Sequence, residues 1–177
     1  GRSGARLHLS GCLRRILLAA RAELGDLRLR RDRPGDRQGA HYLKLAERLA
    51  DHYLGRLDEG LVPYWDFDDP AIPDAPHDSS ASAILAAALL DLAALHPEAE
   101  AALRRAEQAC RVLDALCRDY LARDPRHRGL LEQGCYSRPH DEGVASAVLF
   151  GDFYFTEALC KALLPGHLQP AIEPLRT

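Results

Sequence analysis

The sequence has no apolar run long enough to cross a lipid bilayer. The apolar stretch at residues 13–20 is interrupted by two arginines, and the stretch at residues 83–90 stops at Asp91. A membrane-spanning helix needs about 20 consecutive apolar residues. We therefore expect no membrane segment, and the N-terminal residues show no reliable export signal.

Cysteine pairs with the spacing of a metal or redox site are also missing. The chain has five cysteines, an odd number, and none forms a Cys-x-x-Cys pair. Cys110 and Cys117 are seven residues apart on a helical pattern, which favours ordinary packing over metal ligation. Free thiols are typical of a reducing compartment. We therefore predict a cytoplasmic protein with no zinc site.

The first forty residues lack lysine and aromatic residues altogether. They contain ten arginines and four acids, whereas the remainder has 13 Lys+Arg, 22 Asp+Glu and all 11 aromatic residues. A basic arm can bind nucleic acid, but no aromatic residue is interleaved with these arginines, and no helix-turn-helix or zinc spacing follows. We predict no nucleic-acid partner.

Beyond residue 40, apolar residues recur three and four positions apart, which predicts an all-α chain of paired antiparallel helices. No internal repeat is visible, which argues against tetratricopeptide or ankyrin arrays. Gly and Pro bound residues 129–139, which predicts a short hairpin or an extended loop there. The expected helices are 42–57, 80–95 with Asp78 or Ser79 as N-cap, 98–122 and 144–164.

Within the segment from Val62 to Ile84, Pro70, Pro73 and Pro76 exclude regular structure in the loop before the helix. We expect the rings of Tyr64, Trp65 and Phe67 either to be buried or to stack on a ligand. Aromatic rings beside carboxylates are typical of sugar sites, because a pyranose offers an apolar face to a ring and hydroxyls to acceptors. A solvated proline-rich loop also explains these residues, and helix capping alone also explains Asp78.

A second group of polar residues, Tyr136, Ser137, Arg138 and His140, lies within the expected loop and just after it. Arginine can pair with a carboxylate, and Tyr and Ser can hold hydroxyls. Equally, Tyr136 can cap the core while Arg138 is a surface residue. Asp152 lies inside an apolar helical pattern, where an unpaired charge is costly, so we expect it to have a partner.

Three motifs, in this order, resemble the unsaturated glucuronyl hydrolases of glycoside hydrolase family 88. They are Pro-Tyr-Trp-Asp-Phe with Asp-Ser-Ser-Ala-Ser-Ala-Ile, then Gly129-Leu-Leu with Tyr136-Ser137, then Gly151-Asp-Phe-Tyr-Phe-Thr-Glu-Ala-Leu. The family usually has Trp in the place of Phe150. The resemblance covers about residues 35 to 165 and implies the C-terminal portion of an (α/α)6 barrel.

The resemblance also implies an activity. Such enzymes add water across the C4=C5 double bond of the unsaturated uronate at the end of a lyase-generated oligosaccharide, and the sugar is released when the hemiacetal opens. An aspartate acts as general acid and base, so the resemblance implies that no metal and no cofactor is needed. The family's two catalytic aspartates lie in the N-terminal half, so no catalytic residue is assigned here and the isolated chain is expected to be inactive. Tyr136, Ser137, Trp65 and Asp78 are predicted to bind substrate.

The resemblance divides the chain into an Arg-rich segment (1–34), a partial barrel domain (35–168) and a tail (169–177). The family's Trp-x-Arg-Gly-Gln-x-Trp motif is missing before the helix expected at 42–57. Reading GC-rich codons for residues 16–30 one nucleotide later permits Ser-Cys-Trp-Arg-Arg-Gly-Gln-Ser-Trp. We hypothesise that residues 1 to about 32 are an out-of-frame translation, which the coding DNA tests.

Two further expectations concern the isolated chain. An open part of a barrel exposes the flanks of its helices, so we expect marginal stability or association. The alternative function is a non-catalytic helical-hairpin interaction module, in which the aromatic loop contacts a partner protein and the first forty residues are a genuine basic arm.

Overall fold

The computed structural model describes residues 37–164. Within this range the chain is helical, with isolated β-bridges and no β-strand, so the all-α prediction is confirmed. The segments 1–34 and 169–177, and with them the frame-shift hypothesis, lie outside the described residues. The elements are α2 (Arg37–Leu54), α3 (Ser79–Leu95), α4 (Ala99–Ala115), the π-helix η1 (Leu116–Tyr120), the 3-10 helix η2 (Arg138–His140) and α5 (Leu149–Leu163).

The expected helices are all present, but their boundaries differ from the prediction. The helix expected at 98–122 is α4 followed by the π turn, and it ends at Tyr120. The last helix begins at Leu149 and not at residue 144, because the preceding residues pair with the loop before them. Ser146 and Gly134 exchange two backbone hydrogen bonds of 2.8 and 3.0 Å, and this pairing competes with helix formation.

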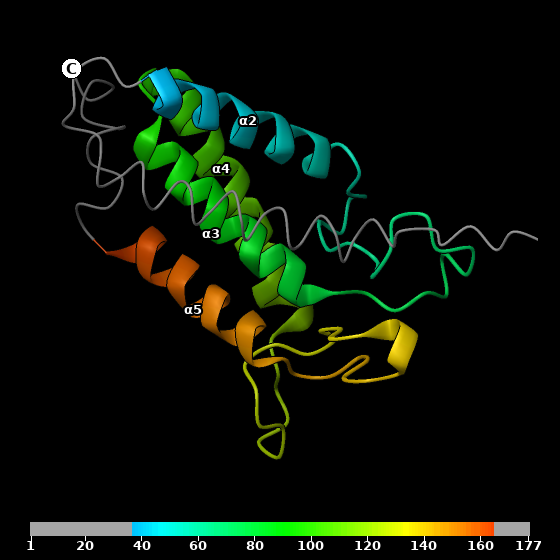
Figure 1. The fold of residues 1–177 in the computed structure, drawn as a ribbon. Coiled ribbons are helices and arrows are strands. Elements are labelled where there is room, and N and C mark those ends of the chain that lie inside the picture. The colour runs from blue at the N-terminus through cyan, green and yellow to red at the C-terminus, as the bar shows by residue number, and fades with distance from the viewer. Residues whose placement is uncertain (1–36, 165–177) are drawn as a thin grey trace, which may run out of the picture.

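Helix α3 is the centre of the core. All of its residues from Ser79 to Ala94 are buried, as expected for a helix that is apolar on every side. It packs extensively against both α4 and α5, whereas those two helices touch each other little (Figure 1). Helix α2 contributes Ala46, Ala50 and Tyr53 to the same core. The small side chains of α3 allow its neighbours to approach closely.

Two ion clusters, each around a buried cation, tie the outer helices to the inner ones. Lys161 on α5 donates to Asp91 on α3 at 2.7 Å and lies 2.9 Å from Glu157. Arg105 on α4 binds Glu47 and Asp51 on α2, the latter at 2.7 Å. Burial by itself lowers the pKa of Arg105, but the two carboxylates raise it above its ordinary value. Such clusters fix which faces of the helices meet.

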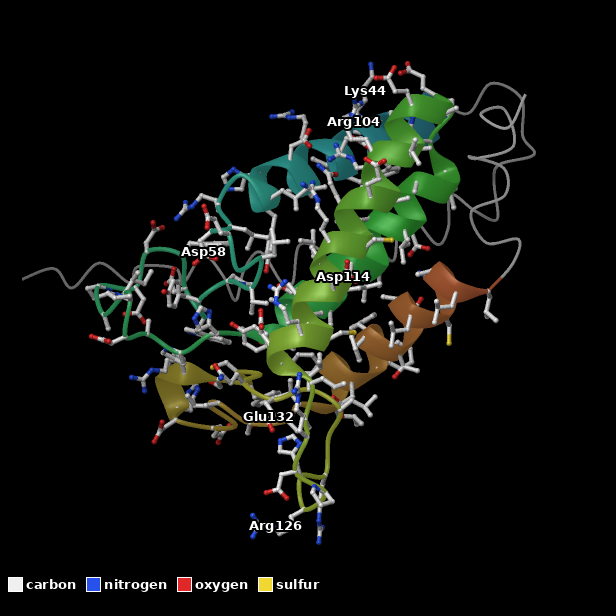
Figure 2. The ribbon with its side chains drawn as sticks, turned by 180° about the vertical axis from the view of Figure 1, so that it is seen from behind. Lys44, Asp58, Arg104, Asp114, Arg126 and Glu132 are labelled. Carbon is white, nitrogen blue, oxygen red and sulfur yellow. The ribbon has the colours of Figure 1, made fainter. Side chains whose placement is uncertain are left out.

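The two long connections lie at one end of the helices. The loop between α2 and α3, and the η2 loop that leads to α5, lie beside the N-termini of α3 and α5 (Figure 1). A narrow segment after η1 projects beyond this end, with Arg126 at its tip and Glu132 at its base (Figure 2). None of the helices in residues 37–164 combines the length and apolar character needed to span a membrane.

Candidate functional site

The two long connections are joined at Asp78, the N-cap of α3. Its Oδ1 accepts hydrogen bonds from the backbone N–H and the hydroxyl of Ser80, at 3.2 and 2.5 Å, and from the N–H of Cys135 at 3.1 Å. Asp78 is only 3% exposed. Helix capping, one of the two interpretations of this residue, is therefore confirmed. The bond to Cys135 adds a link that no local motif predicts.

Ser79 makes a second link between the same loops. Its N–H donates to the carbonyl of Gln133 at 3.1 Å, and its hydroxyl donates to the carbonyl of Glu132 at 2.7 Å. On the other side, the N–H of Asp78 donates to the carbonyl of Pro63 at 2.8 Å. The start of α3 is thus held by residues from both loops. Backbone groups at this buried helix end are satisfied by these partners.

The rings of the first loop pack within the protein. Tyr64 stacks on His77 with ring centroids 4.4 Å apart, and Phe67 meets Tyr53 edge to face at 5.3 Å. Trp65 is 7% exposed. The segment is therefore built around its aromatic residues, and Trp65 presents little of its indole to a ligand from solvent.

The acids of the same loop form local turns. An oxygen of Asp66 accepts from the N–H of Asp68 at 3.0 Å, and one of Asp69 accepts from the N–H of Ala71 at 2.9 Å. Arg56 pairs with Asp68 at 2.7 Å across an exposed surface. These bonds agree with the interpretation of a solvated proline-rich loop for the acids.

The second loop presents Tyr136 and Ser137 at the surface. Tyr136 is 54% exposed, with its ring centroid 6.3 Å from that of Phe150, so the tyrosine is not buried in the core. Ser137 shares a hydrogen bond of 2.7 Å with Nδ1 of His140. Arg138 is exposed, as the surface interpretation expected. An exposed phenol ring beside a hydroxyl suits a sugar.

Asp152 supports this loop from α5. Its two carboxylate oxygens accept the N–H groups of Leu130 and Leu131, each at 3.0 Å. The predicted need for a partner is confirmed, and the partner is backbone. Beside it, Gly151 lies against α3, where an added Cβ would come within 2.9 Å of the Ser80 side chain. Sequence reasoning missed this contact, although glycine inside a helical pattern is a signal of close packing.

The four predicted substrate-binding residues differ in their accessibility. Tyr136 and Ser137 follow directly after Cys135, whose N–H donates to Asp78. The structure therefore brings Asp78 close to Tyr136 and Ser137. Trp65 is linked to the same region through its backbone, since its N–H donates to the carbonyl of Pro76 at 2.8 Å. Tyr136 and Ser137 are accessible, whereas Trp65 and Asp78 are buried beneath the loops.

The thiols and carboxylates in residues 37–164 form no group of three or more His, Cys, Asp and Glu side chains that can hold a metal ion. Cys110, Cys117, Cys135 and Cys160 are free. Burial, followed by the charge of Asp114, raises the pKa of both Cys110 and Cys117. A raised pKa makes these thiols poor nucleophiles near neutral pH.

Comparison with known proteins gives consistent relatives, although no protein-family model matches the chain. The unsaturated glucuronyl hydrolase of Bacillus sp. strain GL1 is 37% identical over 127 residues, which cover 69% of this chain and 33% of that protein. The unsaturated glucuronyl hydrolase of Formosa agariphila is 35% identical over 121 residues, 67% of this chain and 30% of that protein. The unsaturated chondroitin disaccharide hydrolase of Streptococcus pyogenes serotype M1 is 30% identical.

Solved structures agree with these relatives. The crystal structure of unsaturated glucuronyl hydrolase from Bacillus sp. GL1 matches with a TM-score of 0.65 and 35% identity, covering 73% of this chain and 34% of that one. A variant of the Streptococcus agalactiae enzyme, complexed with dGlcA-GalNAc6S, matches with a TM-score of 0.61 and 27% identity, covering 68% of this chain and 32% of that one.

The helical layers and the loops gathered at one end define part of an (α/α)6-barrel glycoside hydrolase. Within that class, the chain belongs to the unsaturated glucuronyl hydrolases of glycoside hydrolase family 88. It spans about a third of the length of the relatives that it matches.

Proposed function

We propose that this chain is one part of a glycoside hydrolase that releases Δ4,5-unsaturated uronic acid from lyase-generated oligosaccharides. The observation that carries the proposal is the junction at Asp78, which joins two of the three resembling motifs through the 3.1 Å bond to Cys135. The names of the relatives supply the reaction class.

The reaction class is hydration of a vinyl ether. A proton adds to C4 of the unsaturated uronate and a water oxygen to C5, after which the ring opens and the bond to the leaving sugar breaks. The step requires a general acid and base near the double bond. We assign that role to no residue of this chain, and we expect the chain by itself to leave the double bond intact.

In this proposal the accessible residues contact the sugar and the buried ones hold the loops. Tyr136 offers a ring for the apolar face of a pyranose, and Ser137 offers a hydroxyl that His140 already orients at 2.7 Å. The burial of Trp65 and Asp78 favours a supporting role, in which they fix the loop backbone from beneath. Direct contact of the substrate with these two is therefore not part of the proposal.

Ligand binding and turnover test the proposal separately. A lyase-generated unsaturated disaccharide is mixed with the purified chain, and saturation-transfer NMR records contact while ultraviolet absorbance of the conjugated double bond records turnover. We expect contact without turnover. Tyr136→Ala should weaken binding about tenfold, the loss of one stacking contact of roughly 1–1.5 kcal/mol.

Tyr42→Ala is the matched control, since Tyr42 is a partly exposed tyrosine on α2, away from the loops. Binding unchanged in Tyr136→Ala, or no binding by the unaltered chain, contradicts the proposed sugar contact. A saturated disaccharide of the same composition tests whether the double bond is recognised. Turnover by the chain alone would show that the necessary acid and base lie within it.

Two further parts of the proposal concern partners and location. The proposed partner is the oligosaccharide. Nucleic acid is not proposed, because no aromatic residue is interleaved with the arginines of the first forty residues. A cytoplasmic location is supported by the free thiols of Cys110, Cys117, Cys135 and Cys160, which a reducing compartment preserves. Fractionation of the native host, with the chain detected in the soluble cytosolic fraction, tests the location.

A further inference from the structure

The narrow segment that projects beyond the loop end of the molecule, residues 121–131, concentrates positive charge. Figure 2 shows Arg126 at its tip (Figure 2). Arg123, Arg126 and Arg128 are all exposed, and Asp124 is the single acid of the segment. The other residues of the range 37–164 hold 10 Lys+Arg against 20 Asp+Glu. This segment, called the basic projection below, is therefore a positive outcrop on an acidic body.

The basic projection is held in shape by its own hydrogen bonds. The N–H of Ala122 donates to the carbonyl of Leu130 at 2.9 Å and joins its two limbs. At the tip, the N–H of Arg126 donates to the carboxylate of Asp124, and the N–H of His127 donates to the carbonyl of Asp124, each at 2.9 Å. The arginines are thus presented on a closed turn. A ligand that binds them does not have to order the backbone first.

The arginines of the basic projection keep hydrogen-bond donors for a ligand. An arginine side chain has five N–H donors in a planar fork. Arg126 uses Nε and Nη2 on the carboxylate of Asp124, and Arg123 uses Nη2 on the carbonyl of Arg118. No hydrogen bond or ion pair joins the side chain of Arg128 to another residue in the range 37–164. The remaining donors match the geometry of a carboxylate.

The basic projection lies at the same end of the helices as the candidate sugar contact. Tyr136 comes five positions after its last residue, Leu131. The first loop, at this same end, carries Asp66, Asp68 and Asp69, which repel an anion. An anionic chain with one end at Tyr136 is therefore drawn towards the projection and away from the first loop.

We propose that the basic projection is a second contact site for the uronate-containing oligosaccharide, and that it binds carboxylates of sugar units beyond the one at Tyr136. The inference rests on the proposed function, because the ligand is the same oligosaccharide. Uronate carboxylates are ionised near neutral pH, so a longer oligosaccharide offers more anions to the three arginines. Each contact is an exposed and weak ion pair. The projection therefore favours long anionic ligands over short ones.

Isothermal titration calorimetry with two products of hyaluronan lyase, the unsaturated disaccharide and the unsaturated hexasaccharide, tests the site. The unaltered chain should bind the hexasaccharide about tenfold more tightly, as expected for two or three exposed ion pairs. In about 1 M salt, where the Debye length is about 3 Å, the two affinities should become equal. Arg123→Gln, Arg126→Gln and Arg128→Gln, made together, should bring them within about twofold at low salt and leave disaccharide binding unchanged.

Lys44→Gln, Arg48→Gln and Arg104→Gln, made together, are the matched control. These three cations are exposed on α2 and α4, and Figure 2 shows Lys44 and Arg104 at the end of the helices opposite to Arg126 (Figure 2). The control variant loses the same formal charge as the projection variant. Its preference for the hexasaccharide should persist, since the lost charges lie more than a Debye length from the site. Circular dichroism of both variants confirms that they are folded.

Four outcomes overturn the proposal. Equal affinity of the unaltered chain for both ligands removes the length preference itself. A preference that survives in the projection variant comes from another surface, and one that is lost in the control variant reflects net charge alone. A DNA oligonucleotide with the charge of the hexasaccharide, bound as tightly, shows an unspecific anion site.

Failure of the proposed function is recognised separately. It appears as disaccharide binding that is absent or is unaffected by Tyr136→Ala. If the hexasaccharide still binds in that case and loses affinity in the projection variant, the sugar contact at Tyr136 fails while the contact at the basic projection stands.

Discussion

Asp78 accepts a hydrogen bond from the backbone N–H of Cys135, 57 residues further along the chain. The same carboxylate caps α3 through the N–H of Ser80. One buried side chain therefore fixes both the start of the central helix and the loop that presents Tyr136. The geometry of the candidate sugar contact depends on a residue that a sugar does not need to touch.

Replacing Asp78 should therefore destabilise the fold and loosen the second loop. We expect Asp78→Ala to cost about 2–4 kcal/mol in the free energy of unfolding, from the lost cap and the buried N–H groups left without this acceptor. Urea denaturation measures it. Asp58→Ala is the control, because the exposed side chain of Asp58 accepts a local hydrogen bond, from the N–H of Gly60 at 2.9 Å. A cost below about 1 kcal/mol would contradict the role of the junction.

Asp152→Asn should release the backbone that Asp152 holds. The amide can accept through only one of its two terminal atoms, so one of the N–H groups of Leu130 and Leu131 loses its acceptor. We expect a loss of about 1–3 kcal/mol and faster hydrogen exchange at these two amides, followed by NMR. In Asp141→Asn, at an exposed position, both amides should exchange at the original rate. Unchanged protection in Asp152→Asn would refute the assignment.

Gly151→Ala should force α5 away from α3. The new methyl would lie 2.9 Å from the Cβ of Ser80 and 3.2 Å from Cγ2 of Val148. Overpacking of this kind costs about 1–3 kcal/mol, measured as a lower midpoint of urea denaturation. Gly60→Ala is the matched change, since its methyl meets only the flexible side chain of Asp58 at 3.1 Å. Equal stability of the two variants would show that the helices adjust freely.

Lys161→Met should be more damaging than the removal of Asp91 and Lys161 together. The single change leaves Asp91 and Glu157 without their cation in a buried site, at a cost of about 3–5 kcal/mol. The double variant Asp91→Leu, Lys161→Met should recover much of that loss, because the more buried carboxylate is removed together with its cation and only the more exposed Glu157 stays behind. A double-mutant cycle on the free energies of unfolding tests this, and additive costs would rule out coupling between the two residues.

The thiol of Cys110 should react slowly although the residue is exposed. Burial of the thiol and then the charge of Asp114 raise its pKa, so less thiolate is present at a given pH. Asp114→Asn should lower the pKa and speed alkylation at pH 8, followed by site-resolved mass spectrometry. Asp124→Asn is the control, at an exposed site. A rate unaffected by Asp114→Asn would exclude the electrostatic cause.

The raised pKa of Cys110 also makes the stability of the folded chain depend on pH. Because the folded state holds the thiol proton of Cys110 more tightly than the unfolded state, this contribution is present below the ordinary thiol pKa of about 8.5 and is lost as pH rises through the folded pKa. Between pH 8 and pH 11, the free energy of unfolding of the unaltered chain should fall as the contribution of Cys110 is lost. The fall should be smaller in Cys110→Ala.

The existence of the helices was predictable because apolar spacing records which faces are buried. The start of α5 was not, since residues such as Ser146 are drawn into pairing with Gly134 and only the folded chain brings those two together. The role of Tyr136 also stayed open in the sequence. A tyrosine beside an apolar helix fits either the core or the surface, and only its 54% exposure decides between them.

The sequence by itself determined the helical class and the family, and it limited the N-cap of α3 to Asp78 or Ser79, because periodicity, capping and short motifs are local properties of the chain. Only the tertiary structure decided which partners those residues find. The bond from Cys135 to Asp78 and the contact of Gly151 with Ser80 join residues through packing, and no local pattern encodes the distance between segments that are far apart in sequence.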